Sequence, residues 1–205
     1  MIQTPQRGAI IMQPPPPRPE EASQPALRPY PSQYISSWSL KDGTPITIRP
    51  IRPEDEPFMV EFHNTLSERS VYMRYFSSMP LRSRVEHERL VRICFPDYAR
   101  EIALVAEYID PGTGRAAILG VGRLIKLLPK DEAEVAVLVS DDWQRRGIGM
   151  ELLQKVLAVA RAEKVGRVSA ELLRDNLGMQ TLLKKNGFRF SLIDDAASIR
   201  ATLDL

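Results

Sequence analysis

The chain has 205 residues, 43% of them hydrophobic, which is enough to bury one sizeable core. Its 28 basic and 26 acidic residues leave a net charge of +2, so composition gives no reason to expect a nucleic-acid partner. The single cysteine, Cys94, excludes an internal disulfide, and two histidines form no cluster at zinc-ligand spacing. No apolar run reaches the roughly 18 residues of a membrane span, and no signal peptide is recognisable. We therefore expect a cytoplasmic protein with no metal and no membrane partner.

Prolines concentrate at the N-terminus. Residues 1–35 hold 9 of the 17 prolines, including the run from Pro14 to Pro17. Proline fixes φ and has no N–H, so such a stretch is unsuited to helix and sheet alike. We interpret residues 1–35 as a disordered extension; a docking peptide for an aromatic-lined groove is the alternative.

The first half of the remaining chain predicts one strand followed by helices. Residues 45–49 alternate as a strand does, and Pro53 with its following acids is typical of a helix start. Phe58, Phe62 and Leu66 then share a helical face, and the polar residues 67–70 interrupt the pattern. Two further short helices are expected, over residues 71–76 and 84–93.

The second half predicts strands joined by two helices. Residues 102–109 and 117–127 flank a turn-rich segment and should form an antiparallel hairpin, with a third strand at 134–140. This order predicts an α/β (α+β) fold, with a mixed, mostly antiparallel, twisted sheet flanked by helices. The remaining expected elements are a helix from Gly147 to near Gly166, a strand at 167–173, a helix at 176–186, and strands at 188–193 and 201–205.

The segment 134–149 runs from an apolar strand through a short basic turn into a helix. The first N–H groups of a helix lack internal partners, and the helix dipole favours anions there. Gly147 and Gly149 let a diphosphate approach the backbone, and Arg145 and Arg146 supply cations. An ordinary strand-to-helix connection with solvated arginines has the same local pattern, so the pattern alone leaves both interpretations open.

Two stretches resemble signatures of the GNAT superfamily of N-acetyltransferases. Gln144-Arg145-Arg146-Gly147-Ile148-Gly149 resembles its acyl-CoA pyrophosphate loop. The stretch 176–188 resembles its second signature, in which an Asn begins a helix and a Gly-Phe pair ends it. The order of the two agrees with the family. The resemblance covers residues 46–205, which we expect to form one acyl-CoA-dependent N-acetyltransferase domain.

The resemblance implies acetyl-CoA as the acyl donor and no metal. In the family, the strand before the loop splays from its neighbour at a bulge; its free backbone groups bind pantetheine, and one N–H polarises the thioester carbonyl. Asn176 matches a position that commonly contacts the cofactor, although Asn is also a common helix N-cap. The expected cofactor-binding residues are Val137, Leu138, Val139, Gln144, Arg145, Arg146, Gly147, Ile148, Gly149, Met150 and Asn176.

An amine acceptor also needs a proton acceptor, because a lysine amine with a pKa of about 10.4 is mostly protonated at neutral pH. Glu134 adjoins the apolar run 135–139, and partial burial would favour proton uptake there, although a strand-end acid facing water is the plainer interpretation. The stretch Ala133-Glu134-Val135-Ala136 resembles the strand that carries the catalytic Glu in bacterial Pat-type protein acetyltransferases. The resemblance makes Glu134 the expected general base.

The Pat resemblance extends to the front of the domain, over residues 48–55 and 66–76. It implies that the acceptor is a lysine ε-amine of a protein, an AMP-forming acyl-CoA synthetase. The chain carries neither the larger synthetase-like domain found fused to some such enzymes nor a recognisable cyclic-nucleotide domain. Leu183 also stands where many GNAT enzymes place a Tyr as general acid. Tyr72, Tyr75 and Tyr98 are weaker candidates for that role.

Other residues are set aside, and two other functions stay open. Cys94 is expected to pack in the core, the two histidines are expected to be surface residues or to have their hydrogen bonds satisfied, and Trp143 is expected to anchor the loop. Arg69, Arg74 and Tyr75 are candidate acceptor-groove residues. The alternative functions are acetylation of a small-molecule amine or a protein N-terminus, and a non-catalytic acyl-CoA-sensing module.

Overall fold

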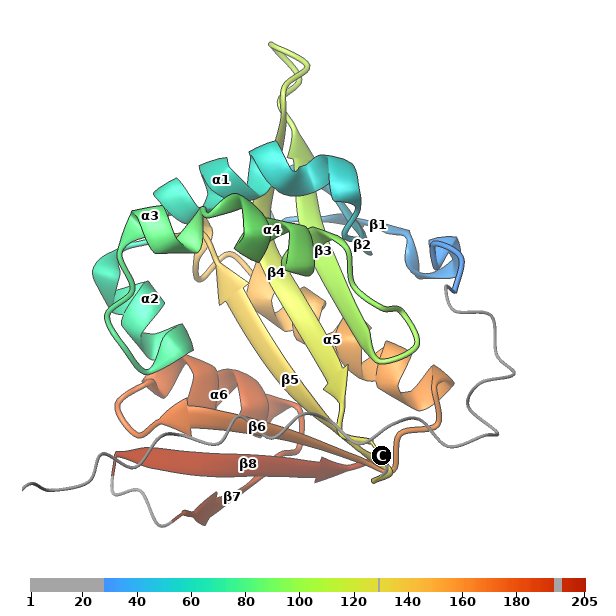
Figure 1. Cartoon of the computed structure of the whole chain (residues 1–205), viewed down its shortest axis with the longest axis vertical. Helices are drawn as coiled ribbons and strands as arrows, with labels where there is room; N and C mark the ends of the chain where they lie inside the picture. The colour runs from blue at the N-terminus through green and yellow to red at the C-terminus, as the bar shows by residue number, and fades with distance from the viewer. Residues whose placement is uncertain (1–27, 129, 194–196) are drawn as a thin grey trace, which may run out of the picture.

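The computed structural model describes residues 28–128, 130–193 and 197–205. Its strands are β1 (Ser36–Ser39), β2 (Pro45–Pro50), β3 (Glu101–Ile109), β4 (Ala116–Lys126), β5 (Glu132–Val139), β6 (Arg167–Leu173), β7 (Arg189–Leu192) and β8 (Ser198–Asp204). They form one sheet in the order β1-β2-β3-β4-β5-β6-β8-β7 (Figure 1). Among the strands of the described residues, only β5 and β6 pair in parallel. The predicted mixed, mostly antiparallel sheet is confirmed.

Helices cover both faces of this sheet. The helices α1 (Glu56–Asn64), α2 (Glu68–Tyr75), α3 (Leu81–Arg84) and α4 (His87–Cys94) precede β3, and α5 (Ile148–Ala162) and α6 (Leu177–Lys185) precede and follow β6. Figure 1 shows α1, α3 and α4 on the face opposite α5. Because side chains alternate along a strand, each face of the sheet builds its own core. One core joins α5 and α6 to the sheet, and the other joins α1, α2 and α4 to it.

The long helix α5 lies unusually close to β4. Its apolar side chains recur at helical spacing, as predicted, and Leu152, Leu153 and Val156 are fully buried. A Cβ placed on Gly120 would lie 3.0 Å from Leu152 Cδ1, and one on Gly122 would lie 3.0 Å from Val156 Cγ2. Both glycines of β4 therefore allow the helix to approach the sheet, which holds its N-terminus at the end of β5.

The N-terminal boundary differs from the prediction. Residues 1–27 of the expected extension lie outside the described residues, but residues 28–35 pack on the domain. The Tyr30 hydroxyl donates to the Pro50 carbonyl at 2.9 Å, and the Tyr34 hydroxyl donates to Glu163 at 3.2 Å. Strand β1 then pairs with β2. The structured chain thus begins well before residue 46, and residues 28–35 belong to the fold.

Two predicted helices and one predicted strand also need correction. Ser67 is not a break but the N-cap of α2, since its hydroxyl accepts a hydrogen bond from Ser70 N at 3.2 Å. The helix expected over residues 84–93 is divided into α3 and α4. Strand β5 begins at Glu132, two residues before its predicted start. In the structure, the polar start of α2 lies beside the end of β5, since Ser67 N donates a hydrogen bond to Asp141.

Candidate active site

Strands β5 and β6 separate near their middle. Their parallel pairing covers three positions, from Glu132 with Arg167 to Glu134 with Ser169, and β5 then continues to Val139 without β6. On its other side β5 stays paired with β4 over its whole length from Ala133 onward, with no shift of register. The backbone groups of residues 135–139 that point away from β4 therefore have no strand partner. The structure contains the splay that the family resemblance implies, but no bulge in the pairing of β5.

A cleft of about 680 Å³ opens where the two strands part. One wall is β5 from Glu134 to Val139, and the other walls come from β6, the start of α5, α6 and one face of α2. Among the predicted site residues, those that line it are Glu134, Val137, Leu138, Val139, Gln144, Arg145, Gly147, Gly149, Met150 and Asn176. Residues from two distant motifs of the sequence thus meet in one cavity.

The start of α5 is suited to an anion. Gly147 is the N-cap residue, in a left-handed conformation with φ 100°, and no side chain caps the first turn. The early N–H groups of α5 are therefore free of the usual side-chain acceptor, and the helix dipole adds partial positive charge. Arg145 adds a full charge, since it lines the cleft and its side chain is exposed. The diphosphate of an acyl-CoA matches this environment.

Two predicted residues of the loop do not present their side chains to the cleft. The Arg146 guanidinium pairs with Asp42 and lies 4.3 Å from the centre of the Trp143 ring. Ile148 is 1% exposed and belongs to the core beneath α5. Arg146 therefore ties the loop to the turn after β1, and Trp143, packed on that core, anchors the same loop.

Gln144 and Asn176 hold the cleft walls in place. The Gln144 side-chain amide donates to Asp141 at 2.7 Å and to the Val139 carbonyl at 3.2 Å, which ties the loop to the end of β5. The Asn176 Oδ1 accepts from Met179 N at 3.1 Å, so Asn176 is an N-cap of α6. Within the described residues, its side-chain amide nitrogen makes no hydrogen bond and remains available as a donor at the cleft.

Glu134 lies at the point where β5 leaves β6. Its alternation along β5 directs it to the face that carries α2, since its neighbours Ala133 and Val135 belong to the α5 core. The predicted partial burial is wrong, because the Glu134 side chain is exposed. Arg74, on α2, lines the same cleft; burial lowers the pKa of its guanidinium, and the nearby Glu134 carboxylate is among the charges that raise it. A carboxylate thus lies near a guanidinium in the cleft.

A hydrogen-bond network that sequence reasoning missed joins α2 to the loop. Asp141 accepts from Ser67 N at 2.7 Å and from the Ser70 hydroxyl, and Ser70 also accepts from Gln144 at 3.1 Å. Partial burial raises the pKa of Asp141, but the hydrogen bonds from Ser67 and Ser70 outweigh burial and lower it overall. Because the partners lie more than 70 positions apart, only their polar character was readable in the sequence.

Leu183, the candidate tyrosines, Cys94 and His63 do not line the cleft. Leu183 is fully buried, and no tyrosine lines the cavity within the described ranges. The Tyr98 hydroxyl instead donates to the Ile51 carbonyl at 3.0 Å. Cys94 is buried, and burial raises the pKa of its thiol to about 12, so it is a core residue as predicted. His63 differs from expectation, because it is 1% exposed and neither ring nitrogen has a partner among the described residues.

Two further findings concern metals and membranes. Within residues 28–128, 130–193 and 197–205, no group of three or more His, Cys, Asp or Glu side chains is placed to hold a metal ion. No helix in the same ranges is long and apolar enough to cross a membrane.

Comparison with known proteins agrees with this geometry. Acetyltransferase PA5475 of Pseudomonas aeruginosa is 29% identical over 167 residues, which cover 82% of this chain and 75% of that protein. Acetyltransferase Pat of Mycolicibacterium smegmatis is 26% identical over 148 residues, which cover 72% of this chain but only 42% of Pat. The crystal structure of the GNAT domain of S. lividans PAT superposes with a TM-score of 0.76 and 28% identity, covering 86% of this chain and all of that domain.

The family model described as the acetyltransferase (GNAT) domain matches residues 46–189, which is most of the chain. The matched residues include β5, β6 and α5, which border the cleft. The chain therefore belongs to the GNAT acetyltransferase family, whose members transfer an acetyl group from acetyl-CoA.

Proposed function

We propose that this protein transfers the acetyl group of acetyl-CoA directly to a lysine ε-amine of a protein, and that the acceptor is an AMP-forming acyl-CoA synthetase. Glu134 is the general base of this reaction. The position of Glu134 carries the proposal, because its carboxylate enters the cleft at the residue where β5 leaves β6. A carboxylate there lies next to the backbone groups that are left without a strand partner.

In the proposed reaction, Glu134 removes a proton from the acceptor ammonium, and the amine then attacks the thioester carbonyl. A C–N bond forms as the C–S bond breaks, and coenzyme A leaves as the thiolate, which takes up the second proton that the attacking nitrogen loses. An unpaired N–H of residues 135–139 stabilises the developing oxyanion; such a donor is worth on the order of 3 kcal/mol in other enzymes. No tyrosine is needed as an acid, because a thiol with a pKa of about 8.5 departs readily as thiolate.

We assign the acyl-CoA to the space between β5 and β6. Backbone groups of Val137, Leu138 and Val139 hold the pantetheine arm, and the first turn of α5 with Arg145 holds the diphosphate. Ile148 and Arg146 contribute at most their backbone N–H groups, because their side chains are directed elsewhere. Asn176 donates from its free amide to the arm, while its oxygen caps α6.

The protein acceptor is supported by the Pat-type character of the domain. The matched structure is a GNAT domain of a protein named PAT, and a curated relative is also named Pat. The chain spans less than half of that curated relative, so regulation through the remainder of Pat does not transfer to this proposal. The first alternative is acetylation of a small-molecule amine or a protein N-terminus. The second alternative is an acyl-CoA-sensing module without turnover.

The experiment compares wild type with Glu134→Gln, which removes the proton acceptor and keeps the side-chain shape. Thiol release from acetyl-CoA is measured with a purified AMP-forming acyl-CoA synthetase as acceptor, and acetyl-CoA affinity is measured by calorimetry. We expect kcat to fall about 100-fold or more, with acetyl-CoA affinity unchanged.

Glu132→Gln is the matched control, since Glu132 shares the strand face with Glu134 but lies outside the cleft lining. It should keep full activity. Equal activity of wild type and Glu134→Gln would remove Glu134 as the base. Binding of acetyl-CoA without turnover of any amine would identify the domain as a sensor.

A further inference from the structure

A second glutamate, which has no role in the proposed reaction, also faces the cleft. Glu171 lies on β6 and lines the same cavity as Glu134. Its strand neighbours Ala170 and Leu172 are buried in the α5 core, so Glu171 projects from the other face of the sheet, as Glu134 does. Two carboxylates on diverging strands therefore face the side of the cleft that carries α2.

The register of the two strands relates these residues directly. Glu134 pairs with Ser169, and Glu171 follows Ser169 by two positions, which is the spacing of side chains on one face. The strands part between these positions, so the carboxylates lie on opposite walls of the opening and are not adjacent strand partners. A group that enters between the walls meets one carboxylate on each side.

Glu171 is only weakly engaged within the described structure. Its carboxylate lies 3.8 Å from the guanidinium of Arg200 on β8, and the side chains of Glu171 and Arg200 are 39% and 53% exposed. Exposed pairs at such distances contribute little, because water competes for both groups. Arg69, Arg74, Arg145 and Asp175 also line the cleft, and Arg74 lies near Glu134. Glu171 is therefore free to accept hydrogen bonds from an entering cation.

We infer that Glu171 is a positioning residue that binds the ammonium form of the acceptor before Glu134 removes its proton. The inference rests on the proposed function, and it identifies the group that binds at Glu171 as a primary ammonium. An ammonium carries three N–H donors, so a single carboxylate leaves donors unpaired when water is excluded. With one carboxylate on each wall, the acceptor nitrogen is held between the base and Glu171. Glu171 acts on binding of the acceptor, whereas Glu134 acts on the chemical step.

The test compares Glu171→Gln, Glu171→Asp and the control Glu132→Gln. With the acceptor that wild type acetylates, we expect Glu171→Gln to raise the acceptor KM about tenfold or more, as expected for loss of a hydrogen bond to a charged group. The values of kcat and of the acetyl-CoA Kd should change less than about twofold, and Glu171→Asp should recover part of the affinity. Glu132→Gln should match wild type.

A second measurement does not depend on turnover. Titration of n-butylammonium into the full chain saturated with coenzyme A should give a Kd that rises about tenfold in Glu171→Gln and stays unchanged in Glu132→Gln. An unchanged KM and an unchanged n-butylammonium Kd would overturn the inference, and Glu171 would then be only a surface residue that pairs with Arg200. A loss of kcat in Glu171→Gln with an unchanged KM would instead make Glu171 the base, and would overturn the assigned roles.

The two proposals fail in different ways. If wild type does not acetylate the synthetase, the proposed acceptor is wrong, and the KM comparison is repeated with whichever amine is acetylated. If no amine is acetylated, the n-butylammonium titration alone decides the role of Glu171.

Discussion

The space around Gly149, in the first turn of α5, indicates why a glycine stands at this position. A Cβ at this position would meet its nearest neighbour, Val139 Cγ2, at 3.6 Å, which is an ordinary contact. Packing therefore does not require glycine there, and helix propensity favours alanine by about 1 kcal/mol. A methyl group would, however, stand at the uncapped helix end beside the cleft.

We expect Gly149→Ala to raise the melting temperature of the ligand-free protein by about 2–4 °C, the usual effect of 1 kcal/mol in a chain of this size. The same change should weaken acetyl-CoA binding about tenfold or more, which is about 1.4 kcal/mol. Thermal unfolding and calorimetry measure the two effects separately. A variant that is more stable and binds acetyl-CoA as wild type does would show that the diphosphate lies elsewhere.

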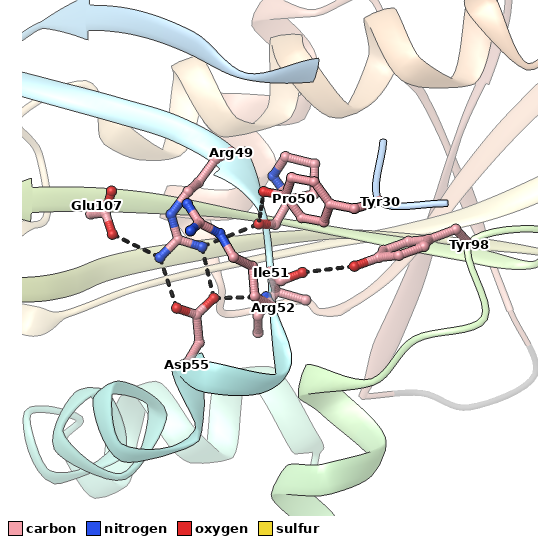
Figure 2. Close-up of polar contacts among 8 residues, drawn as sticks. All are labelled: Tyr30, Arg49, Pro50, Ile51, Arg52, Asp55, Tyr98 and Glu107. Atoms are coloured by element: carbon pink, nitrogen blue, oxygen red, sulfur yellow. Dashed lines mark hydrogen bonds and ion pairs between the residues drawn. The ribbon is translucent and has the colours of Figure 1, made fainter. Parts of the chain in front are cut away.

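At the scale of elements, a buried ion network joins β2, β3 and the start of α1 (Figure 2). Arg49 forms two bonds of 2.7 Å with Asp55 and one of 2.7 Å with Glu107. Asp55 also accepts from Arg52 N at 2.8 Å, which fixes the turn into the helix. Arg49 and Asp55 are each 3% exposed at their side chains, so neither charge has water as a substitute partner.

Asp55→Ala should therefore lower the free energy of unfolding by about 3–5 kcal/mol, because it leaves a buried guanidinium short of a partner. Glu107→Gln is the comparison variant. The Glu107 side chain is 17% exposed and its amide oxygen still accepts a hydrogen bond, so a clearly smaller loss is expected. Urea unfolding followed by circular dichroism measures both. Losses of equal size would mean that the exposed and the buried ends of the network are equivalent.

The elements themselves show which parts of the fold a sequence reveals. Strands β3 and β4 and helix α5 were predictable because each has a long apolar pattern. Strand β1 was not predicted, since its four residues Ser-Ser-Trp-Ser contain one large apolar side chain. The polar start of α2 has the sequence pattern of a break, because its polar residues are typical of loops and capping by Ser67 depends on geometry.

The site divides in the same way. Local motifs with a fixed spacing were enough to single out the loop at residues 144–149 and Asn176, and both border the cleft. The direction of the Arg146 side chain was not predictable, because it depends on Asp42, 104 positions away. Asp141 and Glu171 were missed for a related reason: their roles depend on the packing of α2 and on the parting of two strands.

At the scale of the whole molecule, His63 links stability to pH. Burial, and then the charges of Arg84 and Arg89, lower the pKa of His63 to about 4. In the unfolded chain a histidine has a pKa of about 6.5, so below that pH the unfolded state binds a proton that the folded state does not. Stability contributed by neutral His63 is therefore complete above pH 6.5 and is lost as the pH falls toward 4.

The loss should reach about 3 kcal/mol at pH 4, from a shift of about 2.5 pKa units at 1.36 kcal/mol each. Urea unfolding of wild type and His63→Leu at pH 7, 6, 5 and 4 measures it, and the difference between the two proteins should change steadily across this range. Glu56 raises the pKa of the exposed His87, whose effect runs in the opposite direction and is common to both proteins. A difference that is constant from pH 7 to pH 5 would contradict the assignment.

The parting of β5 and β6 also bears on how the protein avoids aggregation. Sheet edges with unpaired N–H and C=O groups recruit strands from other chains. The two outer edges of this sheet are β1 and β7, and each has only four residues. The longer unpaired stretch, residues 135–139, lies inside the sheet, within the cleft that α2, α5 and α6 border. Among the described strands, the longest edge without a strand partner therefore lies inside the cleft, where a ligand can bind, and not at the outside of the sheet.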